Sequence, residues 1–202
     1  MDFVSILGLT GMALDLVRAA PQLARLIRDK RSFGVSVDTS GTSCAVSLGW
    51  TTYGLVTDQI FVTLASGIMA SFFLITTLVA LRYGRSAREF QITPIWLEGL
   101  SASVLFFGKT GLGLMLSISA LISNVPQIQV AYKEENLSGL SLETWLLTLA
   151  GGLIWGLYAI LRHDLTIITS AFLQSVTSGI IIGLKLFKRS NNGISNQEFT
   201  PD

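Results

Sequence analysis

The chain is short of charge, cysteine, histidine and proline. Only 13% of its 202 residues are charged, and half are hydrophobic. Soluble domains carry about a quarter charged residues. Mean hydropathy is +0.59. This composition indicates an integral membrane protein, with room for about seven spans of roughly twenty residues and almost nothing left for a soluble domain.

These scarcities also exclude classes of function. Cys44 is the single cysteine, so an internal disulfide is impossible, and the thiol is expected to pack as a small apolar group. His163 is the single histidine and is expected on the surface, with no metal site around it. The sequence contains no nucleophile elbow, phosphate loop or basic cluster interleaved with aromatics. We therefore expect no enzyme, no cofactor and no nucleic-acid partner.

What the chain does contain is an internal repeat with a spacing of 105 residues. Uncommon residues recur in register: Pro21-Gln22 with Pro126-Gln127, Trp50 with Trp155, and Tyr53 with Tyr158. One inserted residue is expected before Asp164, which would then match Asp58. Each copy has a long apolar stretch ending in Pro-Gln, a polar basic loop and two further apolar stretches. Agreement at so many positions indicates a duplication.

The apolar runs predict membrane helices over residues 3–27, 42–56, 60–81, 92–107, 111–132, 142–161 and 165–187. The run 92–107 is short and contains Pro94 and Glu98, so it either crosses the bilayer or lies in the interface. If it crosses, most basic residues share one face: Arg25, Arg28, Lys30, Arg31, Arg82, Arg85, Arg88, Lys133, Lys185, Lys188 and Arg189. The other face then holds only Lys109 and Arg162, as the positive-inside rule prefers.

The prediction is therefore an all-α integral membrane protein of seven helices, with its N-terminus outside and its C-terminus in the cytoplasm. Residues 1–84 form one three-helix bundle, 85–109 a linker with an inverting helix, 110–189 a second parallel bundle, and 190–202 a disordered tail. Parallel repeats occur in transporters, with the site between the halves. The N-terminal apolar run has no basic segment before it and is expected to be a retained span.

The motif Pro126-Gln127, a basic loop, Gly139 to Trp145 (Gly-Leu-Ser-Leu-Glu-Thr-Trp), Trp155-Gly-Leu-Tyr158 and Asp164 resembles the PQ-loop repeat of the SWEET and SemiSWEET sugar transporters. The resemblance covers nearly the whole chain and is better in the second copy. It implies alternating-access movement of a small polar solute, a sugar first, across the bilayer. It leaves open a proton-coupled amino-acid exporter of the cystinosin-like kind, a receptor or scaffold of the same fold, and a homo-oligomer. Short loops favour a bacterial inner membrane.

Trp50 and Trp155 are the predicted walls of the substrate pocket, where a flat ring suits the C–H face of a sugar. The alternative is an interfacial aromatic belt. The resemblance implies that an Asn on the next helix assists the residue matching Trp155, but Ala65 and Ala171 occupy those positions. This departure removes two amides from the pocket. The polar residues expected to compensate are Asn124, Thr169, Gln174, Ser170 and Thr63.

Three further groups have two interpretations each. The kinks at Pro21-Gln22 and Pro126-Gln127 are either architectural or paired hinges, and the resemblance implies rocking of the first helix of each bundle. Asp15 and Arg18 form either a self-neutralising pair or a proton or ion site, and Asp15 has Ala120 as its counterpart. The outer helix ends carry either solvated loop charges or an outer gate, made of Tyr53, Asp58, Tyr158, Arg162 and Asp164.

Overall fold

The structure is a computed structural model that describes residues 2–29, 36–134, 137 and 140–197. Within these residues the fold is all-helical, as predicted, and comprises α1 (Phe3–Asp29), α2 (Val37–Val56), α3 (Ile60–Arg82), the 3-10 turn η1 (Ala87–Glu89), α4 (Ile92–Lys133), α5 (Leu142–Arg162) and α6 (Leu165–Gln197). The helices follow the predicted apolar runs closely, because each run is bounded by polar or turn-forming residues.

Helix α4 consists of two helices joined at Gly108, whose φ of 58° and ψ of −145° are not helical. Glycine adopts this conformation without a steric penalty. The linker helix therefore spans 92–107, and the first helix of the second repeat spans 109–133. The two segments approach closely beyond the turn, since a Cβ at Gly111 would lie 2.5 Å from the Ser103 carbonyl oxygen. The arrangement in the described residues is three helices, one linker and three helices.

The third helix of each repeat packs between the other two. α3 contacts both α1 and α2, and α6 contacts both α5 and α4. The repeats meet where α1 packs on α5 and where α2 packs on α4. Because 109–133 repeats α1 and α5 repeats α2, these two interfaces are equivalent.

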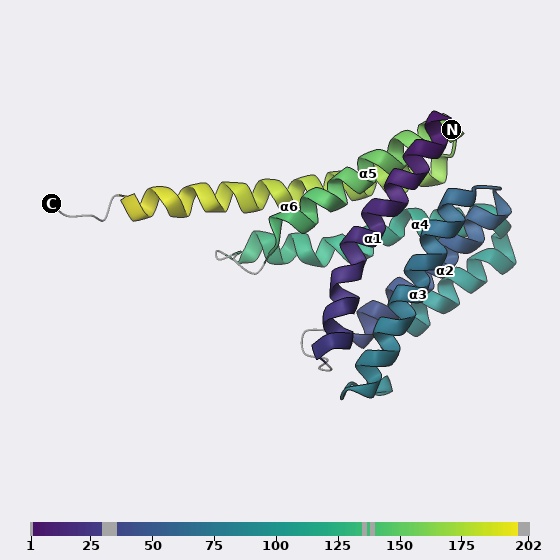
Figure 1. The fold of residues 1–202 in the computed structure, drawn as a ribbon, viewed down its shortest axis with the longest axis horizontal. Coiled ribbons are helices and arrows are strands. Elements are labelled where there is room, and N and C mark those ends of the chain that lie inside the picture. Colours follow the sequence, from purple (N-terminus) through teal and green to yellow (C-terminus); the bar gives the residue numbers. More distant parts are fainter. Residues whose placement is uncertain (1, 30–35, 135–136, 138–139, 198–202) are drawn as a thin grey trace.

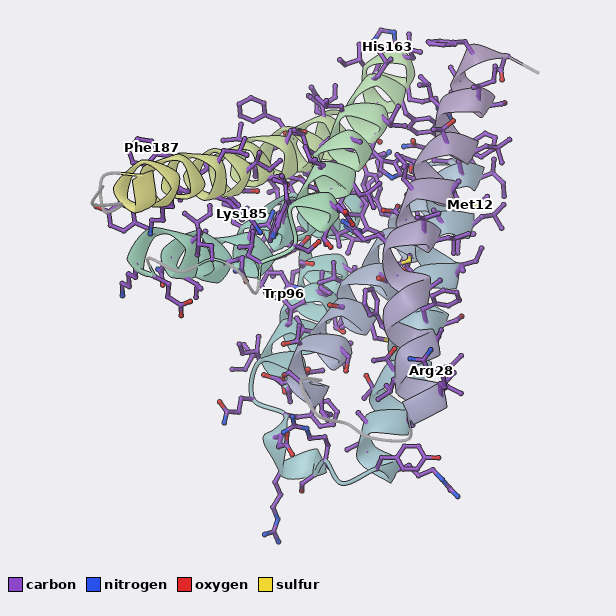
Figure 2. The ribbon with its side chains drawn as sticks, turned by 60° about the vertical axis from the view of Figure 1, so that its left-hand side comes forward. Met12, Arg28, Trp96, His163, Lys185 and Phe187 are labelled. Atoms are coloured by element: carbon purple, nitrogen blue, oxygen red, sulfur yellow. The ribbon has the colours of Figure 1, made fainter. Side chains whose placement is uncertain are left out.

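The two bundles converge at one end and diverge at the other (Figure 1). We call the converging end the turn end, because the tight α2–α3 and α5–α6 turns lie there. The basic ends are the diverging ends, where α1, α3 and 109–133 finish with Arg28, Arg82 and Lys133. Figure 2 shows His163 at the turn end, with Arg28 and Lys185 on the two separate arms.

The turn geometry corrects the predicted repeat register. Asp58 and His163 both have a φ of 53°. The next residue, Gln59 or Asp164, donates its backbone N–H to Gly54 or Ala159 respectively. All of these pairs are 105 residues apart, so the predicted insertion is wrong and Asp164 matches Gln59. The reason is that a left-handed residue must close each helix, which aligns Asp58 with His163. Ser66, and not Ala65, is then the counterpart of Ala171.

The apolar exterior identifies an integral membrane protein. Among the described residues, five stretches are long and apolar enough to span a bilayer: Phe3–Ala20, Ile60–Arg82, Ile92–Leu121, Leu142–Arg162 and Leu165–Lys188. The third of these crosses the Gly108 break. α2 is not among these stretches, because its many Ser, Thr and Gly residues make it less apolar. Leu105, Phe106 and Phe107 of the linker helix are largely exposed, as expected for side chains that face lipid.

The end of α6 differs from the prediction of a disordered tail from residue 190. The helix continues to Gln197. No proline occurs between 165 and 197, so no N–H is missing from the helical ladder at this polar end.

Candidate functional site

A cavity of about 170 Å³ lies between the two repeats. Its lining contains five pairs of residues that are 105 positions apart: Ser47 and Gly152, Trp50 and Trp155, Val62 and Ile167, Ser66 and Ala171, and Met69 and Gln174. The remaining lining residues are Asp15, Arg18, Phe73 and Ser170. The repeat axis therefore runs through the cavity.

The cavity widens towards the basic ends into a chamber of about 480 Å³ that shares Arg18, Ser47, Trp50, Phe73, Ser170 and Gln174 with it. The chamber wall is made mainly by α2 and α4 and reaches Asp38 and Ile92, at the starts of these helices. On the α1–α5 side the wall is made by Arg18 and Thr148. The opening consequently lies between α2 and α4.

The turn end is closed by hydrogen bonds between the repeats. The Tyr53 hydroxyl donates to both carboxylate oxygens of Asp164 at 3.0 Å, and Gln59 Nε2 donates to Asp164 Oδ2 at 2.5 Å. Tyr53 and Gln59 are 6% and 4% exposed, so water competes little for these donors. Asp164 also caps α6 by accepting from the Ile167 N–H at 3.0 Å. One carboxylate thus fixes both a helix terminus and the repeat contact.

The other predicted gate residues surround this closure. Arg162 Nη2 donates to the backbone carbonyl of Asp58 at 3.3 Å. Tyr158 is only 1% exposed, and its ring packs edge to face against the Trp155 indole, with 5.4 Å between the ring centroids. The predicted gate residues therefore gather at the turn end, and their role as a gate stays a prediction.

A charged pair lies on the wall of the cavity. Arg18 Nη2 donates to Asp15 Oδ1 at 3.2 Å, and Arg18 Nη1 donates to Thr148 Oγ1 at 3.4 Å. The second carboxylate oxygen, Asp15 Oδ2, accepts from Trp155 Nε1 at 3.1 Å. The acid and the base neutralise each other, so this pair adds no net charge to the cavity.

The sequence model of the family described as "PQ loop repeat" matches residues 110–168. The chain contains a PQ-loop repeat. A eukaryotic SWEET transporter solved at 3.7 Å resolution matches the structure with a TM-score of 0.74 and 20% sequence identity, covering 93% of this chain and 97% of that one. At this identity the likeness establishes a shared fold. The predicted resemblance to PQ-loop and SWEET proteins is confirmed, and no curated protein sequence matches the chain.

Only some of the predicted substrate residues line the cavity or the chamber. Trp50, Trp155 and Gln174 line the central cavity, and Asn124 lines the wider chamber while donating to Thr177 Oγ1 at 2.6 Å. Thr169 lies outside both linings: it is exposed, and its hydroxyl bonds to the Leu165 carbonyl in its own helix. Helical rotation of about 100° per residue accounts for this, since it carries Ser170 into the cavity and Thr169 out of it.

Sequence reasoning missed seven lining residues, namely Ser47, Val62, Ser66, Met69, Phe73, Gly152 and Ile167. A usable signal exists for four of them. Ser66, Met69 and Phe73 follow Val62 at helical spacings of four, seven and eleven, so the four residues share one face of α3. The spacing of 105 residues that relates the two tryptophans also relates Met69 to Gln174. Applied along the whole chain, it would have matched this face of α3 to the face of α6 that carries Gln174.

The hinge prediction falls largely outside the described side chains. The side chains of Pro21, Gln22 and Pro126 are not among those described, and Gln127 is half-buried on α4. The hinge role therefore stays a prediction.

Asp38, at the mouth of the chamber, holds the start of the linker helix. Its carboxylate accepts from the backbone N–H groups of Gln91, Ile92 and Thr93 at 2.9 to 3.0 Å, and from Thr93 Oγ1 at 2.9 Å. Burial alone would raise the pKa of Asp38, but the hydrogen bonds from Ile92 and Thr93 outweigh it and hold the pKa below its ordinary value. The linker helix is thereby tied to the first turn of α2.

Proposed function

We propose that this PQ-loop protein is a transporter that carries a small polar solute across the bilayer by alternating access. The observation that supports this most is a cavity on the repeat axis, closed at the turn end by the Tyr53–Asp164 contact and widened at the basic ends. Rocking of residues 1–84 against residues 110–189 would exchange the open and closed ends. In the proposed setting, a bacterial inner membrane, the N-terminus is outside and the C-terminus is cytoplasmic.

A sugar is the first candidate substrate. The indoles of Trp50 and Trp155 offer rigid apolar faces to its ring. The hydroxyls of Ser47, Ser66 and Ser170 and the amide of Gln174 supply partners for its hydroxyl groups. A sugar carries no charge, which agrees with a lining whose acid and base neutralise each other.

A zwitterionic amino acid is the second candidate, and the Asp15–Arg18 pair favours it. An ammonium group would bind at the Asp15 carboxylate, and a carboxylate would bind at the planar guanidinium of Arg18. Arg18 lines both the cavity and the chamber, so it is reachable from the open end. Under this alternative, Asp15 is the group that would carry a coupled proton.

Counterflow in liposomes tests both candidates. Purified protein is reconstituted with internal unlabelled solute, and uptake of radiolabelled glucose and of a labelled neutral amino-acid mixture is compared with that of protein-free vesicles. We expect Gln174→Ala to reduce uptake of the active solute about tenfold, as for one lost substrate hydrogen bond to a polar site. Thr169→Ala, on the same helix but outside the cavity, is the matched control. Correctly inserted protein that binds a solute but shows no counterflow would favour a receptor or scaffold.

A further inference from the structure

The two cavity tryptophans occupy equivalent positions but are held differently. Trp155 Nε1 donates to Asp15 Oδ2 at 3.1 Å, which joins α5 of the second repeat to α1 of the first. Trp50 has an edge-to-face contact with Tyr53 at 5.8 Å, within its own helix. Among the described residues, no hydrogen bond of the Trp50 indole is found. One indole is therefore fixed across the repeat interface, and the other is held only by packing.

Gly11 makes the Trp155 position possible. A Cβ at Gly11 would lie 2.8 Å from Trp155 Cε2 and 3.0 Å from Nε1, so the indole lies against the α1 backbone. A ring cannot yield to such a contact as the end of a flexible side chain does. Asp15 is four residues after Gly11, on the same face of α1. Gly11 thus supplies the space for the indole, and Asp15, one helical turn later, supplies the acceptor for its N–H.

The second repeat lacks both features. The counterpart of Gly11 is Leu116, which is fully buried, and the counterpart of Asp15 is Ala120. Leu116 instead packs against Gly49, where its Cδ2 would lie 2.9 Å from an added Cβ. Ala120 offers no side-chain acceptor. An indole at Trp50 consequently has neither the space nor the partner to bind α4 as Trp155 binds α1.

We propose that Gly11 and Asp15 are positioning residues that lock Trp155 onto α1, so that Trp155 is the fixed wall of the cavity and Trp50 is the movable one. Arg18 supports the lock, because it donates to both Asp15 and Thr148, and Thr148 lies two turns before Trp155 on α5. The α1–α5 interface therefore stays closed while the equivalent interface, between α2 and residues 109–133 of α4, opens. That difference matches the position of the chamber between α2 and α4.

This inference rests on the proposed transport function only for its effect on flux. The lock itself concerns the position of the Trp155 side chain, which does not depend on transport. It also assigns Asp15 a role that differs from a proton site. A positioning carboxylate acts as a hydrogen-bond acceptor, and an amide oxygen also accepts from an indole N–H, although more weakly. A proton site requires a group that titrates. Asp15→Asn keeps one acceptor oxygen for the Trp155 N–H and removes the titration, whereas Asp15→Ala removes both the acceptor and the titration.

The position of Trp155 is tested by fluorine NMR of protein labelled with 5-fluorotryptophan. The four resonances are assigned with single Trp→Phe variants. We expect Asp15→Ala and Gly11→Ala to shift the Trp155 resonance, and Asp15→Asn to leave it near its wild-type position. The resonance of Trp96, which is buried on the linker helix, reports whether the fold is intact. A Trp155 resonance unchanged in both Ala variants would overturn the lock, whether or not the protein transports anything.

The consequence is tested with whichever labelled solute, glucose or the neutral amino-acid mixture, is active in counterflow. Trp155→Phe keeps a ring but loses the N–H donor, and we expect about a tenfold loss of flux, the size of one lost hydrogen bond to a charged group. Trp50→Phe should lose less flux than Trp155→Phe, and Trp145→Phe, on α5 but outside both linings, is the control that should retain the flux. Asp15→Asn should lose less flux than Asp15→Ala. Equal losses in the two Asp15 variants would replace the positioning role with a titrating one.

If no solute gives counterflow, the proposed function fails and the NMR result still decides the lock. If counterflow is found but Trp50→Phe loses as much flux as Trp155→Phe, the assignment of fixed and movable walls is overturned.

Discussion

Replacing Asp164 with serine should open the turn end of the cavity. Serine caps a helix about as well as aspartate, because its hydroxyl oxygen can accept the hydrogen bond that the Ile167 N–H donates to Asp164. Its side chain is too short to reach Tyr53 and Gln59, which donate to Asp164 at 3.0 and 2.5 Å. The substitution therefore removes these two contacts between the repeats and spares the helix terminus.

The magnitude follows from the two bonds lost. Hydrogen bonds to a charged partner contribute about 1.5 to 3 kcal/mol each, and the lower end applies here because Asp164 is partly exposed. Tyr53→Phe, which removes one bond, should shift the equilibrium by about 1.5 kcal/mol, or about tenfold. Asp164→Ser should shift it by about 3 kcal/mol, or about 150-fold.

Spin labels at Ile60 and Leu165 measure the opening by double electron–electron resonance. These positions start α3 and α6, are equivalent in the two repeats, and are 59% and 77% exposed, so labels fit without disturbing the core. Cys44→Ser supplies the cysteine-free background, since serine also donates to the Ala70 carbonyl that Cys44 contacts at 3.5 Å.

We expect longer label distances in Asp164→Ser and an intermediate population in Tyr53→Phe. Asp58→Asn is the matched control, because Asp58 is exposed and asparagine tolerates its φ of 53°. Distances in Asp164→Ser that equal those of the wild type would refute the view that this contact closes the turn end.

Three other predictions concern the rest of the chain. External labelling in the cysteine-free background should tag a cysteine at Lys109 and spare one at Arg85, and equal labelling would contradict the parallel topology. Pro21→Ala and Pro126→Ala should leave insertion intact and slow transport, whereas unchanged flux in the double variant would make both prolines architectural. Asp38→Ala should lower the melting temperature. Because the pKa of Asp38 is depressed in the folded protein, the stability that Asp38 contributes is complete above its ordinary pKa and is lost as pH falls through the depressed pKa. A melting difference between the variant and the wild type that persists at the lowest pH would contradict the cap.

Several features of this protein follow from local sequence. A helix in a bilayer must satisfy its own backbone, so each apolar run bounded by polar residues predicts one helix. α3 and α5 accordingly begin at the predicted Ile60 and Leu142. The repeat spacing of 105 is also visible in the sequence, because Pro-Gln, Trp and Tyr recur in step. From these alone the seven-helix, two-bundle fold and the tryptophan pair in the cavity could be predicted.

The tertiary structure decided which side chains meet. Sequence matching paired the two acids Asp58 and Asp164, but the left-handed turn residues Asp58 and His163 set the register and moved Asp164 opposite Gln59. The bond from Trp155 to Asp15 depends on how closely α1 approaches α5, which Gly11 permits. Helical periodicity assigns a residue to a face of its own helix. It carries no information on the distance and angle to the neighbouring helix, because packing of both surfaces determines these.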